Sequence, residues 1–169
     1  MTFILLQKAN GNRIFIEHIR KIIGAFAVCG IISKDIIVIP KRAEVIILEY
    51  ECDSDINIKN GIVIVKPNSA IQNIPKDLPI IIPSFDKSAL NSLLGRDNPI
   101  IACGMGNRDT VSISAICNGN ASICLNRSII TASGELCEEC EILLEKEKYD
   151  DYELMCAAAI LLYCEKYGF

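Results

Sequence analysis

The sequence contains no tryptophan, a single histidine and few aromatic residues, and these shortages exclude several functions. His18 has no nucleophile paired with it in the sequence, so a histidine-based catalytic pair is not expected. Lysine and arginine are scattered and are not interleaved with aromatic residues, which argues against a nucleic-acid partner. The longest apolar run near the N-terminus, Ile22 to Ile32, is about half of the ~20 residues that span a bilayer. No basic signal-peptide region precedes it, so we expect a cytoplasmic protein with no membrane partner.

The chain also lacks the cysteine pattern of a disulfide framework. Its nine cysteines are an odd number and most lie within apolar segments, so we expect free thiols in a reducing compartment. Cys137 and Cys140 form a Cys-x-x-Cys pair, but a structural zinc site needs four ligands, and a redox pair normally opens a helix. We therefore expect two half-buried cysteines near a strand end, with no metal and no other cofactor. A metal shared across an interface between two chains stays open.

Isoleucine dominates the hydrophobic residues, which make up 51% of the 169 residues, and this predicts strand-rich packing. The length fits one domain, residues 1–169. The expected strands are the apolar runs Phe3–Leu6, Ile36–Ile39, Val45–Leu48, Ile62–Val65, Ile80–Ile82 and Ile100–Cys103. Because these runs do not alternate with polar residues, we expect a mostly parallel sheet that is covered on both faces.

Two helices are predicted between these strands. Apolar residues at helical spacing indicate a helix from Arg13 to Cys29, ended by the glycine that follows. Asn10-Gly11-Asn12 before it is a turn signal. Ser84 or Asp86 can cap a second, shorter helix that ends at Gly95.

After Thr110 the pattern changes to alternating apolar and polar residues, which is typical of an antiparallel region with one wet face. The strands expected there are 111–114, 121–126, 128–131 and 141–145. Asn118-Gly119-Asn120 is a strong hairpin signal, and Ser133-Gly134 joins the last two strands. A capping box from Asp150 to Glu153 then begins an apolar core helix. The sequence thus predicts an α/β fold: a mostly parallel sheet flanked by helices, with a C-terminal antiparallel extension and a closing helix.

Several segments of the chain resemble consecutive elements of a known family. They are Ala43–Glu49, a strand ending in Glu; Ile80–Asp86, a strand before a short helix; Ile100–Gly104, a strand entering a glycine turn; and Tyr152–Ala159, the start of an alanine-rich helix. In this order they resemble the later part of the central domain of the Mur ligase family, which includes the folylpolyglutamate synthetases. The resemblance covers residues 43–169 and implies the parallel strands, antiparallel flap and closing helix of that domain.

The chain departs from that family where the family's chemistry resides. The sequence has no phosphate-binding loop of the Gly-Lys-Ser/Thr type. Lys66-Pro67-Asn68 stands in place of the family's His-Asp segment, and the carbamylated-lysine region and the C-terminal domain have no counterpart. ATP-dependent ligase activity is therefore not expected, because shared topology alone does not imply function.

One loop carries the features of a ligand site. The residues expected to bind are Gly104, Gly106, Asn107, Arg108, Asp109 and Thr110. Glycines after a parallel strand permit positive φ and close backbone approach, so backbone N–H groups there can bind an anion, with Arg108 adding charge. Ligands in open α/β sheets bind beyond the carboxyl ends of strands. The alternative is a tight turn in which Asp109 or Thr110 hydrogen-bonds the local backbone.

A second, acidic group follows the strand at 45–48. Its members are Glu49, Glu51, Asp53 and Asp55. They have the oxygen ligands that Mg²⁺ takes, although a solvated loop is the simpler interpretation. The leading hypothesis is a non-catalytic module that binds a small anionic molecule or nucleotide at Gly104–Thr110. Two alternatives stay open: a small transferase or hydrolase using Asp109 and Arg108, or a structural subunit of a homo-oligomer.

Overall fold

A computed structural model describes residues 1–8, 12–51, 56–69, 73–146 and 148–167. The helices in these ranges are α1 (Asn12–Ile23), α2 (Lys87–Ser92) and α3 (Asp151–Tyr163). The first strands are β1 (Thr2–Gln7), β2 (Cys29–Ile32), β3 (Ile37–Val38), β4 (Val45–Tyr50), β5 (Gly61–Ile64), β6 (Ile80–Pro83) and β7 (Ile100–Cys103). The remaining strands are β8 (Val111–Cys117), β9 (Asn120–Leu125), β10 (Ile129–Ile130), β11 (Leu136–Cys137) and β12 (Cys140–Glu145).

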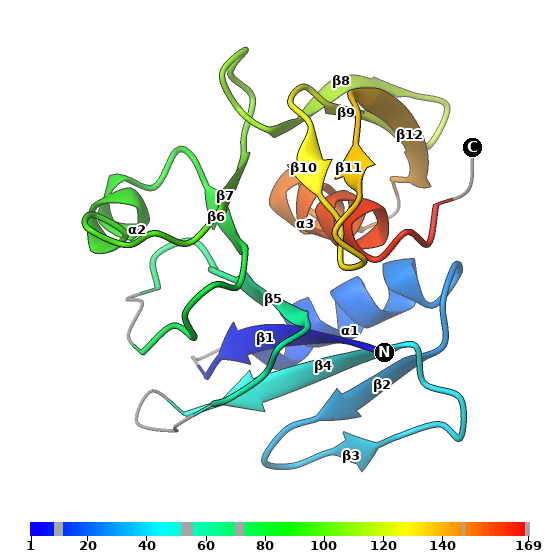
Figure 1. Cartoon of the computed structure of the whole chain (residues 1–169). Coiled ribbons are helices and arrows are strands. Elements are labelled where there is room, and N and C mark those ends of the chain that lie inside the picture. Colours follow the sequence, from blue (N-terminus) through cyan, green and yellow to red (C-terminus); the bar gives the residue numbers. More distant parts are fainter. Residues whose placement is uncertain (9–11, 52–55, 70–72, 147, 168–169) are drawn as a thin grey trace.

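The described strands form one large sheet and one small sheet (Figure 1). The large sheet has ten strands in the order β12-β9-β8-β7-β6-β5-β1-β4-β2-β3, and β10 pairs with β11 in the small one. Pairing is parallel from β2 through β4, β1, β5, β6 and β7 to β8, and antiparallel at β3, β9 and β12. The predicted α/β fold, a mostly parallel sheet with an antiparallel extension, is confirmed.

The central strands are covered on both faces, as their continuous apolar sequences predict. Ile4 and Leu6 of β1 belong to the core that α1 and α3 build on one face of the sheet. Leu5, between them, belongs to the core on the other face, which includes Ala89 of α2. Alternate side chains of a strand point to opposite faces, so an apolar residue at every position requires two cores.

Helix α3 is the predicted closing core helix, and it is buried around its whole circumference. All its residues from Tyr152 to Tyr163 are buried. The predicted capping box is present: the Asp150 carboxylate accepts from the Glu153 N–H at 2.8 Å, and the Glu153 carboxylate accepts from the Asp150 N–H at 3.0 Å. The helix therefore begins at a sharply defined residue.

Two tyrosine hydroxyl groups fix α3 to β5. Tyr163 donates to the Gly61 carbonyl at 2.9 Å, at the start of β5, and Tyr152 donates to the Val65 carbonyl just beyond its end. The helix thus runs antiparallel to β5. Its N-terminus lies at the carboxyl edge of the parallel strands and its C-terminus at their amino edge.

Helix α1 ends earlier than predicted. It stops at Ile23, and Cys29–Ile32 form β2 and pair with β4. Phe26 continues the helical spacing of the residues before it, but it lies beyond the end of α1. Its side chain is 40% exposed, so the helical pattern does not bury it. Pairing with a central strand buries Ile31, and this decides the structure of residues 29–32 against the helical pattern.

Two strand predictions in the connecting regions also need correction. The predicted buried strand Ile36–Ile39 is a two-residue edge strand, with Ile37 72% exposed, because β3 pairs only with β2. Beyond Ser133-Gly134, β10 pairs with the unpredicted β11, and β12 pairs with β9. The Asn118-Gly119 hairpin is confirmed, with φ of 51° and 77°, as a type I′ turn requires.

The second helix and the termini of other elements agree with the sequence patterns. Asp86 is the N-cap of α2, and its carboxylate accepts from the N–H groups of Ser88 and Ala89. Gly95, beyond the end of the helix, has a φ of 80°. Residues 10 and 11 of the predicted Asn-Gly-Asn turn lie outside the described residues. No helix in the described part of the chain is long and apolar enough to cross a membrane.

The tyrosine hydroxyl groups on α3 give a test of how the helix is held. Replacing Tyr152 or Tyr163 by Phe leaves a buried β5 carbonyl with fewer partners, so each change is expected to lower the free energy of unfolding by about 1–2 kcal/mol. The two bonds lie at opposite ends of the helix, so the double variant should lose roughly the sum. Urea unfolding measures both. Full stability in either single variant would show that α3 does not depend on that hydroxyl.

Candidate functional site

The predicted loop after β7 is a tight turn held by its own side chains. Asp109 is buried, and its carboxylate accepts a hydrogen bond from the Gly106 N–H at 2.7 Å. The Thr110 hydroxyl accepts from the Ala102 N–H at 3.3 Å, and the Asn126 amide donates to the Asp109 carbonyl at 3.1 Å. These are the backbone contacts of the tight-turn alternative, in which Asp109 has a structural task.

The glycines of this loop serve close packing and not positive φ. The φ angles of Gly104 and Gly106 lie outside the left-handed region, so the predicted positive φ is wrong. A Cβ on Gly104 would lie 2.0 Å from Ser84 Oγ and 2.5 Å from a carboxylate oxygen of Asp109. At Gly106 the same carboxylate oxygen would be 3.2 Å away. Gly104 is therefore the more crowded of the two positions, where a side chain requires Ser84 or Asp109 to shift.

The outer part of the loop is exposed to solvent. Met105 is 67% exposed, and Asn107 and Arg108 are exposed as well. Arg108 makes no hydrogen bond or ion pair with any described residue, so its charge is free to meet an anion. However, the Gly106 N–H already binds the internal carboxylate of Asp109, which occupies the position of an external anion.

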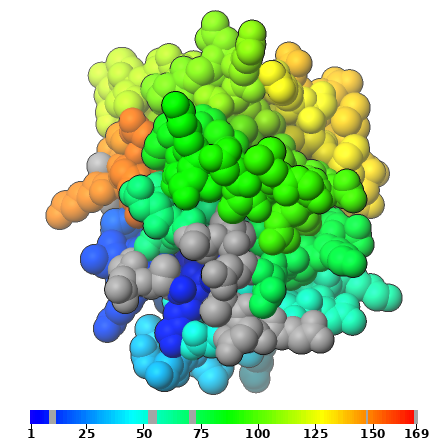
Figure 2. Space-filling model, turned by 90° about the vertical axis from the view of Figure 1, so that its left-hand side faces the viewer, coloured from blue at the N-terminus to red at the C-terminus, as the bar shows by residue number. Residues whose placement is uncertain are grey.

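A cavity elsewhere on the carboxyl edge was not expected from the sequence. It has a volume of about 240 Å³ and lies where β1, β2 and β4 end and α1 begins. Its polar lining residues are Lys8, Asn12, Arg13, Glu17, Ser33, Asp35 and Glu49. Figure 2 views the molecule from the side to which β1 and β4 point, with the β7–β8 loop at the top and the blue β1–α1 region near the bottom. The two candidate sites therefore lie at opposite ends of this face.

Asn12 is a buried polar residue in the lining of this cavity. It is 3% exposed, and its side-chain amide nitrogen donates to the Gln7 carbonyl at 3.0 Å and to the Glu49 carboxylate at 2.7 Å. Both partners are acceptors, so the orientation of the amide is fixed. The amide oxygen is buried, and no described residue gives it a hydrogen bond. Leaving a buried acceptor unpaired costs about 1–3 kcal/mol. Less than 1 Å² of this oxygen is accessible, so a donor in the cavity reaches it only when the side chains around it move.

The cavity has an excess of negative charge. Lys8 pairs with Glu51 outside the lining, and Arg13 pairs with Glu17 at 3.3 Å, which leaves the carboxylates of Asp35 and Glu49. The hydrogen bond to Glu51 raises the pKa of the Lys8 ammonium group, so Lys8 stays charged and paired. The field in the cavity thus favours a cation over an anion.

The central strand β5 brings a further cation to this edge. Lys66 follows β5, at the start of the Lys66-Pro67-Asn68 segment, and its ammonium group lies 5.7 Å from the centre of the Phe15 ring. Burial lowers the pKa of Lys66, and the carboxylates of Glu153 and Glu49 act in the opposite direction. Glu49 therefore acts both on Asn12 and, over a longer range, on Lys66.

The acidic group predicted after β4 is divided in the structure. Glu49 binds Asn12 and Glu51 binds Lys8, whereas Asp53 and Asp55 lie outside the described residues. Within the part of the chain that is described, no three metal-ligating side chains come together.

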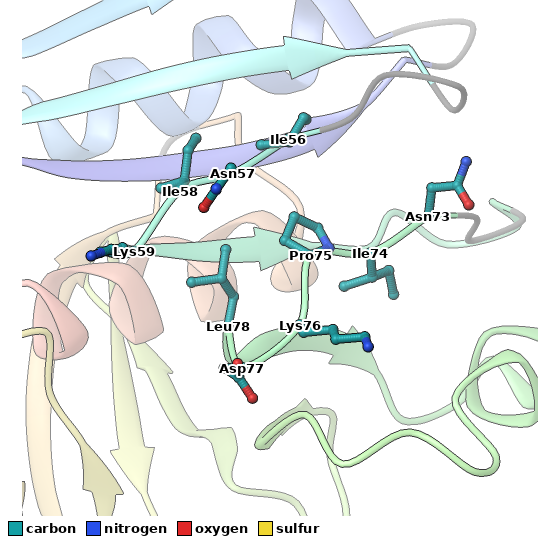
Figure 3. Close-up of a pocket in the computed structure, with 10 residues that line it drawn as sticks. All are labelled: Ile56, Asn57, Ile58, Lys59, Asn73, Ile74, Pro75, Lys76, Asp77 and Leu78. Atoms are coloured by element: carbon teal, nitrogen blue, oxygen red, sulfur yellow. The ribbon is translucent and has the colours of Figure 1, made fainter.

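A larger hollow of the surface runs from Lys59 and Leu78, near the amino ends of β5 and β6, to Ile56 and Asn73, near the carboxyl edge. It has a volume of about 870 Å³ and is lined by two stretches of chain, Ile56–Lys59 and Asn73–Leu78 (Figure 3). These stretches lead into the amino ends of β5 and β6.

The sequence matches no known family model and no curated protein. Solved structures resemble its fold. The UDP-N-acetylmuramoylalanyl-D-glutamyl-2,6-diaminopimelate--D-alanyl-D-alanyl ligase from Acinetobacter baumannii matches with a TM-score of 0.61 at 12% identity, over 98% of this chain and 43% of that one. The murein peptide ligase from Psychrobacter arcticus matches with a TM-score of 0.56 at 11% identity, over 98% and 46%.

These matches show a Mur-ligase-like fold. They extend the resemblance seen from residue 43 onward to nearly the whole chain, including β1 and α1. The chain spans less than half the length of either ligase. At this level of identity the likeness concerns the fold alone.

Substitutions at Gly104 and Gly106 test how closely the chain packs at each position. Gly104→Ala is expected to lower the free energy of unfolding by about 1–3 kcal/mol because its methyl group meets Ser84 and Asp109. Gly106→Ala should cost clearly less, and adding Ser84→Ala to Gly104→Ala should restore part of the loss. Thermal unfolding measures all these variants. Equal stability of Gly104→Ala and wild type would contradict the close-packing account.

Anion binding by the loop stays a prediction with its own test. Arg108→Ala should weaken any nucleotide that binds the loop while changing the free energy of unfolding by less than about 0.5 kcal/mol, as for other exposed residues. Thermal shift with a set of nucleotides and amino-sugar nucleotides provides the readout. If these compounds do not bind wild type, or bind Arg108→Ala equally well, the loop is not an anion site.

Proposed function

We propose that this Mur-ligase-like chain is a non-catalytic binding module, and that its small-molecule ligand presents an ammonium group to Asn12 and Glu49. The observation that carries the proposal is the buried Asn12 amide oxygen, which has no donor among the described residues, next to the Glu49 carboxylate. An ammonium group offers several N–H donors and a positive charge, so it can pair with the Glu49 carboxylate and, once the surrounding side chains move, donate to the Asn12 oxygen as well.

The position of the cavity within the fold supports this proposal. The connection after β1 leads through α1 toward β2, whereas the connection after β5 leads toward β6 on the other side. The direction of winding therefore reverses around β1. Ligands of doubly wound sheets bind at the carboxyl ends of strands at such a reversal.

The charge of the cavity supports an amine over a phosphate. Asp35 and Glu49 form no ion pair within 4 Å among the described residues, so these two carboxylates would repel an anion and attract a cation. Diaminopimelate and alanyl-alanine, groups in the name of the structurally similar A. baumannii ligase, both carry amines. These compounds are therefore the first ligands to test, without assuming that ligase's reaction for this chain.

The non-catalytic part of the proposal rests on the sequence. A phosphate-binding loop of the Gly-Lys-Ser/Thr type is absent from the chain, and such a loop would hold the phosphates of ATP. Magnesium-dependent ATP hydrolysis that copurifies with the protein, and that a point mutation in it abolishes, would contradict a non-catalytic role.

Replacing Glu49 by Gln provides the sharpest test. The Gln amide oxygen still accepts from Asn12, so the fold is retained while the negative charge is removed. Calorimetry with 2,6-diaminopimelate and D-alanyl-D-alanine should show at least roughly tenfold weaker binding to Glu49→Gln, as for a lost charge-assisted hydrogen bond of about 1.5–3 kcal/mol.

One control changes the protein, and the other changes the ligand. Glu141→Gln removes one charge from β12, where Glu141 binds Ser114 and Ser122 far from the cavity, and it should bind the amines like wild type. The N-acetylated forms of the same compounds lack the ammonium group and should bind more weakly to wild type. Equal binding of amines and N-acetyl compounds, or equal binding to Glu49→Gln and wild type, would contradict the proposal.

A further inference from the structure

A second cavity lies at the opposite edge of the parallel strands. It has a volume of about 570 Å³ and is bounded by the β10–β11 hairpin, the start of β12 and the C-terminal end of α3. Cys137 and Cys140 line it together with Leu136 and Leu162. Both cysteines are free and half-buried, as the sequence predicted. Because α3 runs antiparallel to β5, this cavity is separate from that of Asn12 and Glu49.

The two cysteines lie at the ends of a tight connection. Cys137 is the last residue of β11 and Cys140 the first residue of β12, both line the same cavity, and each thiol acts on the pKa of the other. The strands on both sides hold them in place, because β11 pairs with β10 and β12 with β9. Two cysteines three residues apart on one cavity wall are close enough in the chain for an S–S bond of ~2.05 Å to form between them.

The surroundings of the two thiols shift their pKa values by different amounts. Burial raises the pKa of both, that of Cys140 to about 11. The hydrogen bond between them lowers the pKa of Cys137 and raises that of Cys140. The thiol with the lower pKa attacks more readily, which favours Cys137 as the attacking thiol and Cys140 as the resolving one. Their low thiolate content makes the exchange slow, in contrast to a dedicated oxidoreductase.

The rim of the cavity selects the charge of its reactant. Four of its lining residues are glutamates: Glu135, Glu138, Glu139 and Glu165. One of them, Glu165, is held by hydrogen bonds from Thr131 at 3.1 Å and Ser133 at 2.6 Å. These carboxylates attract a cationic reactant and repel an anionic one such as oxidised glutathione.

We propose that Cys137 and Cys140 are a modification site that closes to a reversible disulfide by exchange with a cationic small-molecule disulfide. The Cys137 thiolate attacks one sulfur of the reactant, forms a mixed disulfide and releases the first thiolate. The Cys140 thiolate then attacks the Cys137 sulfur and releases the second. The two cysteines lose two electrons and two protons, and the reactant is reduced to two thiols.

The test uses cystamine, which carries two ammonium groups, on the full chain with Cys117→Ser. After acid quenching, alkylation and peptide mapping, a Cys137–Cys140 disulfide without bound cysteamine is expected. In the same background Cys140→Ser should trap cysteamine on Cys137, and Cys137→Ser should leave Cys140 mostly unmodified. Oxidised glutathione should react at least about tenfold more slowly, and added salt should reduce this difference because it screens charge.

The exposed Cys117 of the unmodified chain serves as the control thiol. It should retain cysteamine as a mixed disulfide, because no second thiol resolves it, and this shows that the reagent is active. The proposal fails if Cys137 and Cys140 stay reduced while Cys117 reacts, or if cysteamine persists on Cys137 with Cys140 present. It also fails if both thiols are blocked by stoichiometric zinc.

Discussion

The attachment of α3 to β5 determines the geometry of both edges of the sheet. The helix is apolar on all sides, so it needs no exposed face, and its few buried polar groups fix its position. The hydroxyl groups of Tyr152 and Tyr163 bind carbonyls at the two ends of β5. Buried Glu153 binds His18 of α1 at 2.8 Å, so the same helix also positions α1, whose first residue is Asn12. The other end of α3 closes the cavity of the two thiols.

Much of the fold could be predicted because its signals are local. The continuous apolar strands, the Asn118-Gly119 turn and the Asp150–Glu153 capping box each depend on residues close together in the sequence. The errors arose where a distant partner decided the structure. Residues 29–32 are a strand because β4 pairs with them, and the isoleucine-rich β3 is exposed because nothing in the described sheet lies beyond it. Neither the pairing with β4 nor the edge position of β3 can be read from local spacing.

The candidate sites show the same difference between local sequence signals and contacts made by distant residues. Two glycines after a strand indicated a loop of unusual backbone, but the side chain that fills this loop is its own Asp109. No comparable sequence signal marks Asn12, the first residue of α1. Its importance depends on Glu49, 37 residues away, and on an amide oxygen that receives no donor from the described residues. An unpaired buried atom becomes visible only in three dimensions.

We propose that the ligand binds where β1 meets α1. Titration of ¹⁵N-labelled protein with 2,6-diaminopimelate, followed by heteronuclear NMR, locates the bound amine directly. We expect the largest shift changes in the Asn12 side-chain amide and in backbone amides that line its cavity. Changes concentrated instead at residues 56–59 and 73–78, or at the Gly104–Thr110 loop, would contradict it.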